Sequence, residues 1–82
     1  MVIEGYNHKG YHVFPGAMQL RNDDGTDGDF YPTVSVMRWR GDETPLSVPY
    51  AWSEHRFKTA VEAQGFAAHA AHDLIERGVI PF

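Results

Sequence analysis

The sequence predicts an α+β fold in which a three-stranded antiparallel sheet, in the chain order β-β-β-α, packs on one C-terminal helix. Three observations support this prediction: an alanine-rich final stretch, a long aromatic and β-branched stretch in the middle, and the absence of repeats. A chain of 82 residues forms a single domain, here residues 1–82. Laying the helix on one face of the strands is the simplest way to bury the alanines.

The first strand is expected at about residues 10–14, between Gly10 and the Pro15-Gly16 pair. Residues 17–21 continue it after a break at that pair. The acidic stretch 22–29 follows and is rich in residues that favour turns. It does not match a calcium-binding EF-hand loop, because glycine and valine fall where two of the ligands belong. We therefore expect a solvated hairpin loop here.

The longest strand is expected at about residues 30–39, and a third at about 46–50. Alternation along the longer strand places Val34 and Val36 on one face, which we assign to the core. Prolines at positions 45 and 49 limit the third strand and favour a place at the edge of the sheet.

The helix is expected at about residues 60–77. Thr59 and Glu62 have the spacing of a capping box, in which the hydroxyl accepts from the Glu62 amide and the carboxylate reaches back to the Thr59 amide. Gly78 suits the left-handed position after the last turn, where Val79 would add an apolar contact. The predicted buried face consists largely of alanine, which allows a close approach to the sheet.

No sequence pattern indicates catalysis or a cofactor. The serines lack the context of a nucleophile, no glycine-rich loop precedes a helix, and there is no cysteine. His69 and His72 lie three residues apart on the outer side of the predicted helix and could supply part of a metal site, but no further ligand is fixed nearby. Pairing with Asp73 and Glu76 on an exposed helix explains them as well, and we assign no metal and no catalytic residue.

The composition excludes some function classes. No stretch is long and apolar enough for a signal peptide or a membrane span, so a cytoplasmic protein without membrane contact is the expectation. The formal net charge of -4 argues against a general nucleic-acid binder.

One predicted helix covers only one face of the sheet. If Val34 and Val36 face the helix, then Tyr31, Met37 and Trp39 face away from it. Exposed aromatic residues gathered in this way are typical of an interaction surface. The other interpretation is that the long loops, Trp52 or the N-terminal segment cover them. The sequence leaves both open.

The segment that holds Trp39 is also the most basic part of the chain. Arg38 and Arg40 flank Trp39, and arginine beside tryptophan can bind phosphates or stack on bases. The same three residues could equally form the rim of a protein interface.

The chain resembles a family of small, uncharacterised proteobacterial proteins in three segments, which are Gly10–Val13, Asp29–Val36 and Arg56–Ala63. The shared pattern is strand, turn and strand, followed by Phe-x-Thr-x-x-Glu-Ala at the start of the last helix. This resemblance spans most of the chain; it implies a fold and carries no activity.

The same ending is similar to plant AP2-type and phage-integrase arm-binding domains, which place three strands before such a helix. That similarity implies DNA binding through the exposed sheet face, with Arg38, Trp39 and Arg40 as the matching contacts.

The leading functional hypothesis is a non-enzymatic interaction domain that binds a protein partner or a second copy through the open sheet face. The alternative is a DNA-binding module that uses the same face, and a metal-binding or enzymatic role comes third.

Overall fold

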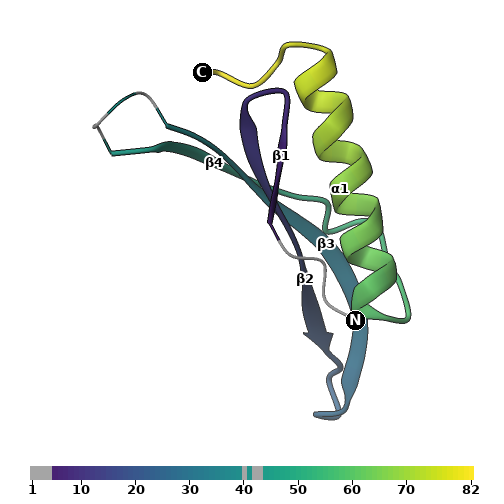
Figure 1. Ribbon diagram of the computed structural model, residues 1–82. Helices are drawn as coiled ribbons and strands as arrows, with labels where there is room; N and C mark the ends of the chain where they lie inside the picture. Colours follow the sequence, from purple (N-terminus) through teal and green to yellow (C-terminus); the bar gives the residue numbers. More distant parts are fainter. Residues whose placement is uncertain (1–4, 40, 42–43) are drawn as a thin grey trace.

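The computed structural model describes residues 5–39, 41 and 44–82. Its five elements, in chain order, are β1 (Tyr6–His8), β2 (Tyr11–Arg21), β3 (Asp27–Arg38), β4 (Leu46–Ala51) and α1 (Ala60–Glu76). The strands form one antiparallel sheet in the order β1-β2-β3-β4, and α1 lies across one face (Figure 1). The α+β class with an antiparallel sheet and one C-terminal helix is confirmed. The prediction of three strands is wrong, because the sheet has four.

The strand that the sequence analysis missed is β1, which pairs with the start of β2. The two strands are joined by the turn Lys9-Gly10, in which both residues have positive φ angles of 50° and 84°. Two positive φ angles define the tight hairpin turn whose twist matches the twist of paired strands. The register places Tyr6 opposite Val13 and His8 opposite Tyr11. Three residues are too few to show a period, so this strand left no clear pattern in the sequence.

The second strand is continuous and does not break at Pro15-Gly16, as the sequence analysis expected. Pro15 lies opposite Val34 and Gly16 lies opposite Thr33, so both residues belong to the regular ladder with β3. The backbone N–H and C=O groups of successive residues point to alternate sides of a strand. Pro15 and Val13 are two residues apart, so the backbone groups of both point away from β3. Proline is tolerated there because no N–H is needed toward β3. The predicted strand end at residue 14 therefore becomes an end at Arg21.

The helix begins and ends close to the predicted residues, but the Glu62 carboxylate accepts from the Thr59 hydroxyl, where the prediction had the Thr59 amide. The Thr59 hydroxyl accepts from the Glu62 amide at 3.2 Å and donates to the Glu62 carboxylate at 3.0 Å. At the other end Gly78 has a φ of 71° and donates to the Ile75 carbonyl, while Val79 donates to Leu74. Val79 itself is exposed, and the apolar contact expected of it is made by Ile80.

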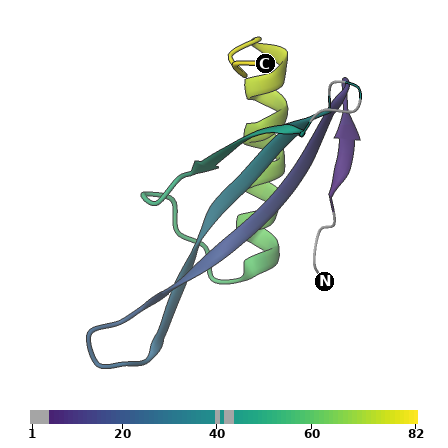
Figure 2. The same ribbon diagram turned by 90° about the vertical axis from the view of Figure 1, so that its left-hand side faces the viewer.

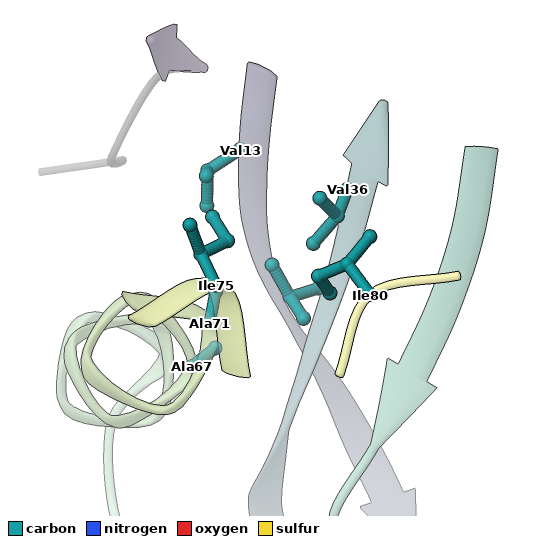
Figure 3. Packing of buried hydrophobic residues seen from close by; sticks show 7 residues of the cluster. Val13, Val36, Ala67, Ala71, Ile75 and Ile80 are labelled. Carbon is teal, nitrogen blue, oxygen red and sulfur yellow. The ribbon is translucent and has the colours of Figure 1, made fainter. Parts of the chain in front are cut away.

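The core lies between α1 and the covered face of the sheet (Figure 3). Its buried members come from two central strands, from the helix and from the tail that follows the helix, and they are Val13, Val34, Val36, Ala67, Ala71, Ile75 and Ile80. Alanine at the helix positions lets the helix backbone approach the valines closely. The predicted assignment of Val34 and Val36 to the helix side is what the structure has.

The molecule is elongated, with extents of 48 × 23 × 23 Å. The far end of the β2–β3 hairpin extends beyond α1, as Figure 2 shows. At the hairpin turn Asp24 accepts from the amide and the hydroxyl of Thr26, and these bonds lower the pKa of Asp24. Hydrogen bonds from the loop's own side chains therefore stabilise the conformation of the acidic loop. Within the described residues, no helix is both long enough and apolar enough to cross a bilayer.

The capping contact gives a first prediction. Replacing Thr59 by alanine removes the acceptor of the Glu62 amide and should lower the free energy of unfolding by about 0.5–2 kcal/mol in urea. Ser53→Ala removes an exposed hydroxyl outside the helix and serves as the control. Equal stability of the two variants would show that the cap contributes nothing.

The two faces of β3 give a second prediction. Val36 is fully buried, and Val36→Ala should lower the free energy of unfolding by about 2–3 kcal/mol. Trp39 is 47% exposed on the other face, and Trp39→Ala should cost the monomer less than about 1 kcal/mol. Chemical denaturation at low protein concentration measures both. A larger loss for Trp39→Ala would mean that the faces are reversed.

Candidate functional site: the open sheet face

The face of the sheet that points away from α1 is the candidate site, and we call it the open face. The strand registers and the alternation of side chains define its members. They are Asn7 of β1; His12, Phe14, Gly16 and Met18 of β2; Asp29, Tyr31, Thr33, Ser35 and Met37 of β3, with Trp39 just beyond it; and Ser47, Pro49 and Ala51 of β4.

The structure brings the predicted residues Tyr31, Met37 and Trp39 onto this one face. Tyr31 and Met37 are partly buried by their neighbours, while Trp39 is exposed. Trp39 meets the ring of His12 edge-on, with 4.5 Å between ring centroids, so it does not project freely into solvent. This contact fixes the direction in which the indole is presented.

The sequence analysis missed the contribution of β2 to the open face. His12, Phe14 and Met18 share one parity along this strand, and Phe14 and Met18 are 39% and 53% exposed. The rings of His12 and Phe14 are stacked at 6.3 Å. The signal was present as alternation, but a strand predicted to end at residue 14 could not display it.

Trp52, one of the residues proposed to cover the open face, does not lie on it. Its ring is on the helix side, where it meets Phe66 of α1 edge-on at 5.8 Å. His55 and Phe57 also contact Phe66, at 4.5 and 5.7 Å, and the three close one end of the core. The N-terminal residues 1–4, another proposed cover, lie outside the described residues. Gly5 is described, and it packs against the ring of Phe14.

The open face carries little charge. Asp29 is its one charged member, and it pairs with Lys58 at 3.1 Å. The other described ion pairs involve His8 of β1, the Lys9 turn, loops and the helix. The face is therefore sparsely charged, although the chain as a whole has a formal net charge of -4.

The shape of the open face follows from side-chain size. Bulky residues lie at two ends, with Met18 opposite Tyr31 at one end and His12 opposite Met37 at the other. Between them Phe14 is opposite Ser35 and Gly16 is opposite Thr33. A Cβ on Gly16 would lie only 2.8 Å from the Thr33 hydroxyl, so this position accepts no larger side chain without adjustment. The face is therefore low at Gly16 and Thr33 and bulky on either side of them.

The three residues implied by the similarity to DNA-binding domains are not brought together. Arg38 lies on the helix side, where its guanidinium covers the ring of Tyr11 at 5.1 Å and donates to the Tyr11 hydroxyl at 3.3 Å. Trp39 lies on the open face. Arg40 lies outside the described residues.

His69 and His72 do not share the exposed position that the sequence predicted. His69 is exposed, but His72 is half-buried against β1, with its Nε2 atom 2.6 Å from the Tyr6 hydroxyl and its ring stacked on His8 at 4.1 Å. Asp73 pairs with Arg77 and Glu76 pairs with Lys9, in place of the predicted helical pairs with histidine. Among the described residues, no group of three or more potential ligands is placed to hold a metal ion.

The chain has no match among protein-family models, curated proteins or solved structures. The resemblances stated from the sequence therefore stay predictions.

Proposed function

We propose that this domain is a non-enzymatic interaction module and that its open face binds a second copy of the same chain. The observation that supports the proposal is a sparsely charged surface rich in aromatic and methionine side chains, which α1 does not cover. Phe14, Met18 and Trp39 are all exposed on it. Exposed apolar side chains gathered on one surface are typical of contact sites.

Charge does not oppose a second copy as the partner. In a dimer with twofold symmetry the same surface patch meets itself, and a charge that lies near the axis faces its own copy. The open face carries one charged side chain, Asp29, which lies beside Lys58 at the end of β3 near the hairpin. Two acidic chains therefore meet at low electrostatic cost through this face.

Shape favours self-association. Two sheets pack face to face about 10 Å apart, and their side chains interdigitate. A twofold axis that passes between the two regions would place Trp39 and Met37 of one copy over Gly16 and Thr33 of the other. Tryptophan is a favoured anchor in interfaces, and methionine adapts its shape to the surface that it meets.

Sedimentation equilibrium tests this proposal. We expect a reversible monomer–dimer equilibrium, and Trp39→Ala should raise the dissociation constant at least about tenfold, because truncating an interface anchor costs 1 kcal/mol or more in each copy. The matched control is Val61→Ala. Val61 is 40% exposed on α1, away from the open face, and its loss should leave the equilibrium unchanged. A protein that is monomeric at all accessible concentrations would overturn the proposal.

A charge variant makes the same test without removing an aromatic ring. Met18→Glu places a carboxylate on the open face and should weaken the dimer, whereas Gln19→Glu adds the same charge to the next residue, which points to the other side. If both variants weaken the dimer equally, net charge is responsible and the open face is not the interface.

The DNA-binding alternative stays a prediction. Binding to duplex DNA rests on cationic side chains that displace counterions from phosphates. The open face offers none among the described residues, because Arg38 is engaged with Tyr11 on the helix side.

We therefore expect no appreciable binding to random duplex DNA at near-physiological salt in a gel-shift assay. A clear shift at micromolar protein that weakens steeply with salt, and that Arg38→Ala and Arg40→Ala reduce, would favour DNA binding over self-association.

A further inference from the structure

A cluster of titratable side chains joins β1 to the C-terminal half of α1, on the helix side of the sheet and not on the open face. We call it the histidine contact; its members are Tyr6, His8, Lys9, His72 and Glu76. The His8 and His72 rings are stacked with their planes 11° apart and their centroids 4.1 Å apart. The Tyr6 hydroxyl lies 2.6 Å from His72 Nε2, and the Glu76 carboxylate binds both His8 and Lys9.

We propose that the histidine contact is a pH-dependent connection, which holds β1 on α1 while at least one of the two stacked imidazoles is neutral and releases β1 when both carry a proton. The proposal concerns the edge of the sheet and does not depend on the function proposed for the open face.

A proton on His8 would lie beside a carboxylate. The His8 Nε2 atom lies 3.3 Å from one oxygen of Glu76, and the other oxygen is bound by Lys9. Hydrogen bonds from Lys9 and, to a smaller degree, from His8 lower the pKa of Glu76, so this carboxylate is charged wherever histidine titrates. A protonated His8 therefore faces an opposite charge, and the stack persists beside a neutral His72.

A proton on His72 has no such place. A neutral imidazole can accept from the Tyr6 hydroxyl through Nε2, whereas a protonated one can only donate to the Tyr6 oxygen. Burial raises the pKa of Tyr6, so its hydroxyl keeps its own proton in either arrangement. With both imidazoles protonated, the two stacked rings would both be positive at 4.1 Å. The charge on a half-buried His72 therefore creates a repulsion between the stacked rings.

The other charged groups near His72 do not remove this cost. Burial is the largest cause that lowers the pKa of His72, the imidazoles of His8 and His69 lower it further, and Glu76 alone acts in the opposite direction. The neighbouring Asp73 is paired with Arg77 at 2.6 Å on the outer side of the helix. From β1 and its turn, the facing groups are Tyr6, His8 and Lys9, as described above.

The sign of the pH effect follows from that direction. A histidine whose pKa is lowered by folding stabilises the folded arrangement fully above its unfolded pKa of 6.5, and this contribution is lost as the pH falls through the lower folded pKa. Release of β1 is therefore expected below about pH 6.5 and not above it.

Release would be local. β1 has three residues and pairs with β2 alone, whereas α1 packs on β2 and β3 through the buried core. Short elements with few buried contacts open before the rest of a domain. Opening of β1 would uncover Tyr6, which packs against the core, and the outer edge of β2 from Tyr11 to Val13.

Amide hydrogen exchange followed by NMR tests the proposal. Protection factors, corrected for the intrinsic pH dependence of exchange, should fall in β1 by roughly threefold or more between about pH 7.5 and about pH 5.5. Protection at Val34 and Val36 of β3 should stay constant over that range. His72→Phe keeps a flat ring against His8 but cannot take up a proton, and it should abolish the pH dependence of β1. His55→Phe makes the same change outside the contact and should behave as the native chain.

A second measurement keeps the test decisive if His72→Phe fails to fold. In the native chain the NMR titration of His72 should lie below that of an ordinary histidine, and His8→Gln should move it upward by removing the facing charge. Three results would overturn the proposal: constant protection of β1 across the range, an equal loss of protection in β1 and β3, or a His72 titration that His8→Gln leaves unchanged.

Discussion

The structure depends on one packing constraint, which is the close approach of an alanine-faced helix to the valines of two central strands. Ala67 and Ala71 are fully buried against the sheet, and Val13 and Val36 lie opposite one another beneath them. Small side chains allow that approach, but they also make the helix face narrow, so it cannot cover a four-stranded sheet alone. The tail at Ile80 and the aromatic group around Phe66 extend the cover on that side. No helix of the described residues covers the other side, and the open face is the consequence.

Local signals in the sequence were sufficient for much of this fold. The capping pair at Thr59 and the glycine at position 78 mark the helix ends, because the backbone groups that they satisfy lie within a few residues. Alternation along β3 assigns Val34 and Val36 to one face and Tyr31, Met37 and Trp39 to the other, because that strand is long enough to show its period. These features belong to single elements, and a single element carries its own pattern.

Features that depend on pairs of distant elements were not predictable in the same way. The pairing of β1 with β2 depends on a two-residue turn and three residues, and its contact with the helix joins positions 66 residues apart, Tyr6 and His72. On the helix alone His72 looks exposed, since only the position of β1 buries it. Pro15 was expected to break a strand, yet at an outer ladder position it is compatible with one. In the candidate site the part contributed by β3 was predictable, whereas the part contributed by β2 required the full length of that strand.

Two edge positions of the sheet limit pairing with a foreign strand. The Trp52 amide donates to the Pro32 carbonyl, so the backbone N–H and C=O groups of Pro32, Val34 and Val36 point toward β4. These groups alternate in direction along a strand, and Val34 is opposite Tyr50. The backbone of Pro49, the residue before Tyr50, therefore points away from β3, toward the free edge. Proline at that position removes a donor from the free edge of β4, which limits pairing with a foreign strand. At the opposite edge β1 occupies the start of β2, held there by side chains from the helix. Edge-to-edge association is thus disfavoured at both places, while no helix of the described chain covers the open face. A largely apolar face beside edge positions that limit strand pairing supports the face-to-face contact that we propose.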